Sequence, residues 1–316
     1  MRVLITGGAG FIGSNLVEFL LDKGFFIRVI DNLATGNIDN IRPFFNHPNF
    51  EFLEGDIRDF NTCEKACHGM DAVDHQAALG SVPRSVKDPV TTNAVNIDGF
   101  LNILTAAKNE GIKRFVYASS SSVYGDEPNL PKVEDRIGKP LSPYAVTKYT
   151  NEVYADVFAK TYHMEPIGLR YFNIFGPKQD PNGEYAAVIP LFIKSLMNDT
   201  APFINGDGEQ TRDFTYVDNA VQANYLALIT KNADAYNQAY NIAVGERFSI
   251  NQMYDDICSH LSKNIPAIHR EPRAGDIRNS LADISKAKRL LGYVPLVNFN
   301  QGLPKTISYF VNVFAK

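Results

Sequence analysis

Residues 3–13 read VLITGGAGFIG, a short apolar run that ends in a cluster of glycines. The apolar run is typical of a buried strand, and the segment that follows, Ile12–Lys23, has the apolar spacing of a helix. In this setting Gly7 permits a tight turn, Gly10 lets the backbone approach a pyrophosphate, and Gly13 allows close packing of helix on strand. Glycines also serve ordinary turns, but their place between a strand and a helix favours a dinucleotide site.

The alternation of strand and helix continues through the first half of the chain. Strands are expected at Arg2–Thr6, Phe26–Asp31, Phe50–Glu54, Ala72–His75, Arg114–Ser119 and Pro166–Arg170. Helices are expected at Ile12–Lys23, Phe60–Cys67, Pro89–Asn109 and Pro143–Tyr162. Repeated βαβ units predict class α/β, as a Rossmann-type doubly wound parallel sheet with helices on both faces.

The rhythm breaks near Phe172. Further helices are expected at Val188–Met197, Asp218–Ile229, Ile250–Leu261 and Ser285–Leu291. We therefore expect a Rossmann domain over residues 1–171, to which segments at about 214–242 return. A smaller, partly interrupted C-terminal α/β substrate domain over 172–316 should close over the carboxyl edge of the sheet, where ligands of such sheets bind.

Composition excludes several classes of function. A formal net charge of −4 over 316 residues argues against nucleic acid and membrane surfaces as partners. The chain shows neither a signal-peptide pattern nor an apolar run of about 20 residues, as a membrane span requires. The three cysteines, Cys63, Cys67 and Cys258, indicate neither a disulfide framework nor a metal site. A reduced cytoplasmic protein is expected.

Asp31 ends the second expected strand, where its carboxylate can accept both hydroxyls of a ribose. It would repel a 2′-phosphate, since two like charges at ~4 Å cost about 4 kcal/mol at an effective dielectric constant near 20. NAD is therefore expected rather than NADP. An ordinary strand-end role for Asp56 and simple packing of Ala77 and Ala78 are equally open. The remaining expected cofactor residues are Phe11, Ile12, Asn32, Thr35, Gly36, Ile57 and Gln76.

Tyr144 and Lys148 lie four residues apart in the expected long helix and so share one face. An ammonium beside a phenol stabilises the phenolate. Lowering a tyrosine pKa by about three units needs roughly 4 kcal/mol, which a close cation together with the charge of a nicotinamide can supply. The serines at 119–122 close the fifth strand and could share the proton of a reacting hydroxyl. A Tyr-x-x-x-Lys pattern taken alone is more often a pair of surface residues. Here the pattern follows a Rossmann turn and a serine-rich strand end, and this context favours a catalytic role.

Several motifs together give the chain a family resemblance. TGGAGFIG, HQAA, SSSSVYG, SPYAVTK, LRYFNIFGP, INGDGEQTRDF and RAGD span nearly its whole length. The chain resembles extended short-chain dehydrogenases/reductases of the nucleotide-sugar epimerase type. The resemblance implies Tyr144 as base, Lys148 as its electrostatic helper and Ser120 as serine partner, with Ser121 sharing that task. It also implies that Asn96, Tyr171, Tyr144 and Lys148 line the cofactor site.

The same resemblance implies a UDP-sugar as substrate. Matching motifs imply binding by Gly80, Ser81, Arg84, Ser122, Asn173, Gln179, Ala187, Val188, Asn205, Arg212, Arg273, Asp276 and Ser280. Related dehydratases carry Thr-Asp-Glu where this chain has three serines, 120–122, which favours 4-epimerisation through a transient 4-keto sugar. Dehydratase, decarboxylase and reductase outcomes remain alternatives. A non-catalytic NAD-binding protein would be expected to have a broken Tyr/Lys pair.

The choice of sugar rests on resemblance to bacterial UDP-N-acetylglucosamine 4-epimerases. Ser280 stands where epimerases restricted to plain hexoses have a bulky tyrosine, so UDP-GlcNAc and UDP-GalNAc are the expected pair. The uronic acids that correspond to these two sugars are expected next, and UDP-glucuronate and UDP-glucose remain alternatives. Arg84 could pair with a C6 carboxylate of a uronic acid, or serve a helix start or a phosphate.

Two further expectations concern burial and assembly. Asp74 falls in the fourth strand where the family has an apolar residue, so it lies at the strand end, is locally hydrated, or needs partners.

A homodimer through the helices Pro89–Asn109 and Pro143–Tyr162 is implied by resemblance. The apolar residues Leu101, Leu104, Val153 and Val157 fit that contact or packing on the sheet.

Overall fold

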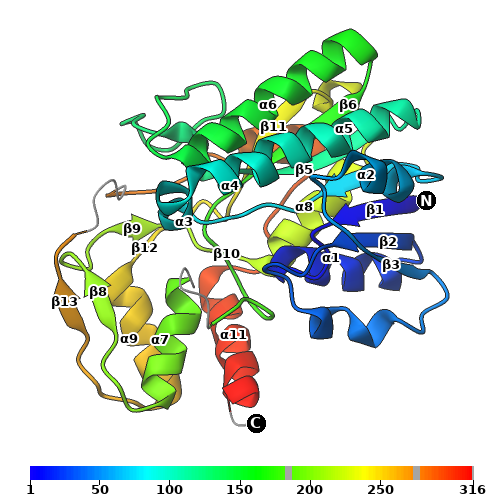
Figure 1. Ribbon diagram of the computed structural model, residues 1–316. Coiled ribbons are helices and arrows are strands. Elements are labelled where there is room, and N and C mark those ends of the chain that lie inside the picture. The colour runs from blue at the N-terminus through cyan, green and yellow to red at the C-terminus, as the bar shows by residue number, and fades with distance from the viewer. Residues whose placement is uncertain (182–186, 273–277, 315–316) are drawn as a thin grey trace.

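The computed structural model describes residues 1–181, 187–272 and 278–314 (Figure 1). Its main sheet has seven strands in the order β11-β6-β5-β4-β1-β2-β3, and every neighbouring pair is parallel. The strands are β1 (Arg2–Thr6), β2 (Phe26–Asp31), β3 (Phe50–Glu54), β4 (Ala72–His75), β5 (Arg114–Ser120), β6 (Glu165–Tyr171) and β11 (Gln238–Ile242). The strand order reverses between β1 and β4, so the predicted Rossmann-type fold is confirmed.

Most helices lie where the sequence predicts them. They are α1 (Phe11–Asp22), α2 (Phe60–Cys67), α6 (Pro143–Tyr162), α7 (Val188–Met197), α8 (Val217–Ile229), α9 (Ile250–Leu261) and α10 (Ser285–Leu291). The helix predicted over Pro89–Asn109 is divided into α4 (Pro89–Asn93), a π-helical turn (Ala94–Asp98) and α5 (Gly99–Asn109). Two helices were not predicted, α3 (Val82–Lys87) and α11 (Phe299–Phe314).

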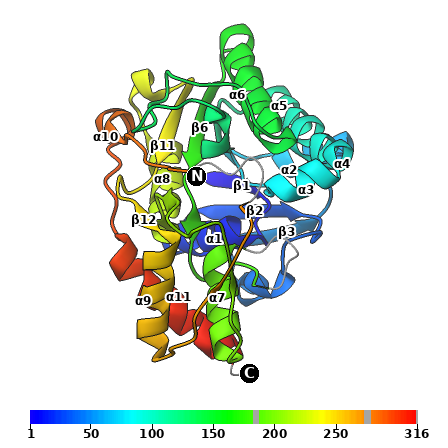
Figure 2. The same cartoon turned by 90° about the vertical axis from the view of Figure 1, so that its left-hand side faces the viewer.

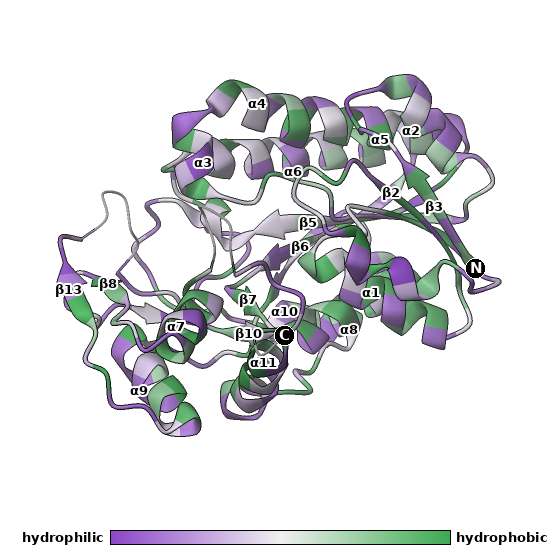
Figure 3. Ribbon diagram, turned by 60° about the horizontal axis from the view of Figure 1, so that its bottom comes forward, coloured by the Kyte–Doolittle hydropathy of each residue, from purple (hydrophilic) through white to green (hydrophobic). Residues whose placement is uncertain are grey.

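Helices cover both faces of the sheet (Figure 2). Helices α1 and α8 pack on one face, where Leu16, Val17 and Ala220 join Val3 and Ile5 in a buried cluster. On the other face, α2, α5 and α6 form a second buried cluster with Leu4 and Val73. Successive residues of β1 thus point to opposite faces, and both faces are apolar, as a buried parallel sheet requires. Figure 3 shows hydrophobic residues of β2 and β3 between these two layers.

A smaller lobe lies below the carboxyl edge of the sheet in Figure 1. Helices α7, α9 and α11 pack together there, beside the strand pairs β8 (Phe203–Asn205) with β13 (Ile268–Arg270) and β9 (Thr211–Arg212) with β12 (Phe248–Ser249). The pair β7 (Ile174–Phe175) and β10 (Thr215–Tyr216) connects the lobes. In the described part of the chain, no helix is long and apolar enough to cross a membrane.

The position of Asp74 is now settled. It is the third residue of β4 and is fully buried, so neither a strand-end position nor exposure to solvent describes it. One carboxylate oxygen accepts a hydrogen bond from Gln76 Nε2 at 2.6 Å, and the other has no hydrogen-bond partner among the described residues. Burial raises the pKa of Asp74 to about 7, since the charged form is poorly solvated there.

Candidate active site

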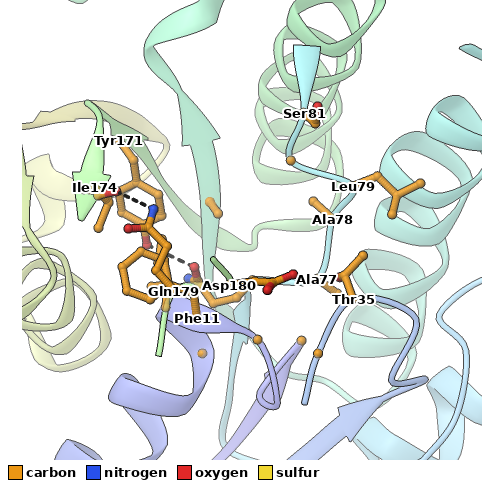
Figure 4. Close-up of a pocket in the computed structure, with 18 of the residues that line it drawn as sticks. Phe11, Thr35, Ala77, Ala78, Leu79, Ser81, Tyr171, Ile174, Gln179 and Asp180 are labelled. Carbon is orange, nitrogen blue, oxygen red and sulfur yellow. Dashed lines mark hydrogen bonds between the residues drawn. The ribbon is translucent and has the colours of Figure 1, made fainter. Parts of the chain in front are cut away.

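One large cavity opens at the carboxyl ends of the strands, on the side that faces the smaller lobe. Its volume is about 1690 Å³, whereas a site for one small molecule takes roughly 300–1,000 Å³. The cavity therefore has room for two ligands of that size. Figure 4 shows part of its wall, where Phe11, Tyr171, Gln179 and Asp180 approach one another across from Thr35 and Ala77.

The glycine turn forms one end of this cavity. Gly7 has a positive φ of 68°, and a Cβ on it would come within 2.7 Å of the Ala77 backbone. A Cβ on Gly13 would collide with the carbonyl oxygen of Gly7, so the helix starts in direct contact with the turn. Gly10 is the N-cap of α1, whose first N–H groups face the cavity that Phe11 and Ile12 also line. The turn can therefore cradle a diphosphate.

Asp31 is held in place by two backbone groups. Its two carboxylate oxygens accept hydrogen bonds from the N–H of Ala9 at 2.9 Å and of Leu33 at 2.8 Å. Burial raises its pKa, and these two hydrogen bonds lower it. Gly36 lies against the carboxylate, where a Cβ would be 3.0 Å from both oxygens. A bare backbone there leaves the carboxylate open to a ribose.

A second carboxylate, Asp56, lies at the same end of the cavity. Arg58 binds it through Nε at 3.0 Å and Nη2 at 2.6 Å, and Asn32 donates to it at 2.9 Å. The Arg58 hydrogen bond, more than any other contact, holds the pKa of Asp56 well below its usual range. Arg58 lines the cavity and was not predicted, although its spacing from Asp56 was visible in the sequence.

The expected catalytic groups lie together in the same cavity as the glycine turn. Tyr144 lies in the first turn of α6, which begins at the N-cap Ser142, and Lys148 lies one turn later. Lys148 is almost fully buried and donates from Nζ to the carbonyl oxygen of Ala118 at 2.8 Å. Ser120 ends β5 and hydrogen-bonds to Tyr144. All of these side chains except that of Ser142 line the cavity.

Burial shifts the pKa values of Tyr144 and Lys148 in opposite directions, each toward the neutral form. Burial raises the pKa of Tyr144, and the hydrogen bond with Ser120 lowers it only in part. Burial also lowers the pKa of Lys148 to about 8, although Glu152 raises it. The ammonium donates to a backbone carbonyl, so Lys148 does not by itself make Tyr144 a phenolate in this structure. Ionisation of the phenol therefore needs the further positive charge of a bound cofactor.

Two cavity-lining polar atoms are left without a partner among the described residues. Ser122 Oγ and Gln179 Oε1 are buried and accept or donate no hydrogen bond. The amide nitrogen of Gln179 donates to the carbonyl oxygen of Ile174 at 3.2 Å, as Figure 4 shows. Buried polar atoms in this state cost free energy unless a ligand or water satisfies them. They fit a polar ligand such as a sugar.

The structure brings most of the predicted residues together. Those that line the cavity are Gly7, Gly10, Phe11, Ile12, Gly13, Asp31, Asn32, Thr35, Gly36, Asp56, Ile57, Gln76, Ala77, Ala78, Gly80, Ser81, Ser120, Ser121, Ser122, Tyr144, Lys148, Tyr171, Asn173, Gln179, Arg212 and Ser280. Arg273 and Asp276 lie outside the described residues.

Five predicted residues lie away from the cavity wall: Arg84, Asn96, Ala187, Val188 and Asn205. Asn96 is buried, and its side chain bonds both the N–H and the carbonyl of Leu79, so it shapes the loop that lines the cavity. Asn205 Oδ1 accepts from Arg270 at 2.7 Å.

The smaller lobe also supplies cavity residues that the sequence did not indicate. Leu191 of α7 and Tyr309, Phe310 and Val313 of α11 line the wall. The three residues of α11 were missed because that helix was not predicted, whereas Leu191 lies in a predicted helix whose contact with the cavity depends on the fold.

Comparisons with known proteins agree with this geometry. Residues 3–243 match the model of the NAD dependent epimerase/dehydratase family. A putative UDP-glucose 4-epimerase of Methanocaldococcus jannaschii is 38% identical over 312 residues, which cover 98% of each chain.

Two solved structures are similar over nearly the whole chain. The UDP-N-acetylglucosamine 4-epimerase of Methanobrevibacter ruminantium, in complex with UDP-N-acetylmuramic acid, is 41% identical with a TM-score of 0.93, covering 99% of this chain and 98% of that one. The UDP-glucuronic acid 4-epimerase of Bacillus cereus, in complex with UDP-glucuronic acid and NAD, is 33% identical with a TM-score of 0.93, covering 99% and 100%.

Proposed function

Because this chain belongs to the NAD dependent epimerase/dehydratase family, we propose that it inverts C4 of UDP-N-acetylhexosamines, interconverting UDP-GlcNAc and UDP-GalNAc. NAD is its cofactor, and a UDP-sugar 4-epimerase is the activity that its relatives support. One observation carries the proposal: Tyr144, Lys148 and three serines meet the glycine turn inside one cavity. Residues 120–122 are all serine, so the acid and base that a dehydratase uses for elimination are absent at those positions.

In the proposed reaction, Tyr144 accepts the proton of the sugar 4-hydroxyl. Ser120 holds the same oxygen, since it hydrogen-bonds to Tyr144, and Ser121 assists. Lys148 stabilises the phenolate form of Tyr144, which is the form that can accept this proton. Bound NAD supplies a place for the C4 hydride, which returns to the other face of the 4-keto sugar once the sugar has turned. The phenol then returns its proton to the 4-oxygen.

Turning of the sugar requires that the nucleotide is held firmly and the sugar loosely. We propose that the UDP half is bound by the smaller lobe, through Asn173 and Arg212, which line the cavity, and through Arg273 and Asp276. The Rossmann part, residues 1–171 with 214–242, would hold NAD. Asn173 Nδ2 donates to the carbonyl oxygen of Asp213 at 3.2 Å. This hydrogen bond joins the start of the smaller lobe to the residue that precedes the returning segment 214–242.

The N-acetyl preference rests on Ser280. Its side chain lines the cavity, and its backbone N–H donates to Thr211 at 3.0 Å, which fixes the segment. A serine leaves space that a tyrosine would fill. The relative that binds UDP-N-acetylmuramic acid supports the same preference.

We also propose a homodimer through helix α6. Val146, Tyr149, Val153 and Val157 recur at helical spacing on its outer face, and each is more than 40% exposed. Leu104 is fully buried, so packing on the sheet accounts for it. Sedimentation should give a dimer for the parent chain and a monomer for Val153→Asp. The control is Val294→Asp, since Val294 is 52% exposed elsewhere, and it should leave the dimer intact.

The substrate proposal is tested by assaying four sugars side by side: UDP-GlcNAc, UDP-GalNAc, UDP-glucose and UDP-glucuronic acid. We expect the two N-acetyl sugars to have the highest kcat/KM. A strong preference for UDP-glucose or for UDP-glucuronic acid would contradict the N-acetyl proposal and leave 4-epimerisation intact.

We further propose a cytoplasmic location, which the three free thiols support.

A further inference from the structure

Four side chains form a polar network behind the cofactor side of the cavity. They are Asp74 of β4, Gln76 just after β4, Tyr171 at the end of β6 and Asn224 of α8. Asp74 and Asn224 are fully buried, whereas Gln76 and Tyr171 line the cavity. Figure 4 shows Tyr171 on that wall. The network thus connects a buried carboxyl group to the surface that a cofactor would contact.

The hydrogen bonds of the network fix the orientation of the Gln76 amide. Its Nε2 donates to Asp74 Oδ1 at 2.6 Å and to Asn224 Oδ1 at 3.0 Å, which uses both amide protons. Its Oε1 lies 3.2 Å from the hydroxyl of Tyr171, whose single proton is shared between this oxygen and Asn224 Oδ1 at 3.1 Å. Asn224 Nδ2 donates to Tyr171 and to Ala220, each at 2.7 Å. The nitrogen end of the Gln76 amide therefore points to Asp74, and the oxygen end points to Tyr171.

In the part of the chain that the structure describes, no cation pairs with the Asp74 carboxylate. In the sheet, its neighbours in register are Ile5 of β1 and Val116 of β5, both apolar. From α8 the neutral Asn224 enters the same network. His75, next along β4, points to the opposite face and hydrogen-bonds to Thr6.

The other titratable group that faces Asp74 is Tyr171 of β6. Burial raises the pKa of Tyr171, and the charge of Asp74 raises it further. Burial raises the pKa of Asp74 to about 7, and only the Gln76 hydrogen bond lowers it. Asp74 can therefore change its protonation state near neutral pH.

We propose that Asp74 is a positioning residue that sets which end of the Gln76 amide faces the NAD cavity, and that it releases a proton when NAD binds. As a carboxylate, Asp74 can only accept, so the amide nitrogen must point toward it. As a neutral acid, its hydroxyl can donate to Gln76 Oε1, and the amide can turn over. The oxidised nicotinamide ring is positively charged and favours the amide orientation that turns Gln76 Oε1 toward the cavity wall, which is the orientation that the Asp74 carboxylate requires. This inference rests on the proposed place of NAD in the cavity, but not on the choice of sugar.

The test is a calorimetric titration of NAD into the full chain after removal of bound dinucleotide. At pH 7, titrations in two buffers with different heats of ionisation give the number of protons released. The parent should release about half a proton, as expected for a group that titrates near that pH. Its Kd for NAD should rise about fivefold from pH 8 to pH 6, the equivalent of one ordinary hydrogen bond.

Asp74→Asn should release no proton, and its Kd should be the same at both pH values. The matched control is Asp213→Asn. Asp213 is also buried, with a pKa raised to about 6 by burial, but its oxygens accept from three backbone N–H groups, of Val244, Gly245 and Ala282. Because Asp213 does not line the cavity, this variant should keep the proton release of the parent.

Gln76→Leu tests the same proposal independently, because its Kd for NAD can be measured even if Asp74→Asn does not fold. Without the amide, the dependence of the NAD Kd on pH should shrink, and adding Asp74→Asn should change the Kd no further. The proposal is overturned if Asp74→Asn keeps the parent's proton release, or if Gln76→Leu keeps its full dependence on pH. A parent chain that does not bind NAD at all would instead contradict the proposed function.

Discussion

Replacing Lys148 with methionine should make the NAD-free protein more stable at pH 7 while removing its activity. The ammonium is nearly fully buried, and burial lowers its pKa from 10.5 to about 8. That difference of about 2.5 units corresponds to about 3 kcal/mol. Methionine cannot make the hydrogen bond to the carbonyl of Ala118, and this loss lowers the free energy of unfolding by about 1 kcal/mol. Lys148→Met should therefore gain about 2 kcal/mol in the free energy of unfolding at pH 7.

The gain should depend on pH in a defined direction. Between pH 8 and 10.5 the unfolded chain binds the Lys148 proton and the folded chain does not, so the parent becomes more stable as the pH rises. The advantage of Lys148→Met should thus disappear above about pH 10. Urea unfolding at pH 7 and pH 10 measures both values.

The matched control lies on the same helix. Lys160 has a side chain that is 69% exposed and pairs with Asp156, so Lys160→Met should change stability by less than about 1 kcal/mol at either pH. The reasoning is refuted if Lys148→Met is less stable than the parent at pH 7, or if its advantage is the same at both pH values.

The remaining predictions concern the cavity and its walls. Tyr144→Phe should lower kcat by at least about 100-fold and leave the Kd for NAD within about twofold, because it removes only the base; steady-state kinetics beside calorimetry check both values. Ser280→Tyr should lower kcat/KM for UDP-GlcNAc by at least about tenfold and spare UDP-glucose, because the ring would fill the N-acetyl space; equal losses for both sugars would contradict this. Gly13→Ala should destabilise the fold by more than about 1 kcal/mol and weaken NAD binding, since its Cβ would collide with Gly7; thermal unfolding with and without NAD measures both. Asp74→Asn should be more stable than the parent at pH 8 by up to about 4 kcal/mol, because the raised pKa makes the carboxylate costly above pH 7, and this gain should vanish below about pH 4; denaturant unfolding at those two pH values decides it.

The main sheet could be predicted because each strand carries its own local signal. The first four strands were predicted with the bounds that the structure has, since each is a β-rich segment bounded by turn residues or a helix. The glycine turn and the Tyr144–Lys148 pair were found for a similar reason, because each depends on spacing within one or two elements. The division of the helix at Ala94–Asp98 has no such signal and was missed.

The rest of the site depends on contacts between distant segments. Lys148 reaches the carbonyl of Ala118 from 30 residues away, so its hydrogen bond could not be read from either segment. Helix α11 contains Pro304, which interrupts the helical pattern, yet it brings Tyr309 and Val313 to the cavity. The network of Asp74 joins residues from three separate elements. Sequence could flag Asp74 as unusual, but only the fold identified its partners.

The central claim is that the hydrogen on C4 of a UDP-sugar leaves and returns within one active site. Incubation of the enzyme with UDP-GlcNAc that carries deuterium at C4, followed by NMR and mass spectrometry, tests it most directly. The account predicts UDP-GalNAc of unchanged mass with the deuterium retained at C4, and no accumulation of free NADH. Loss of the deuterium to solvent, or a product lighter by one water, would contradict it.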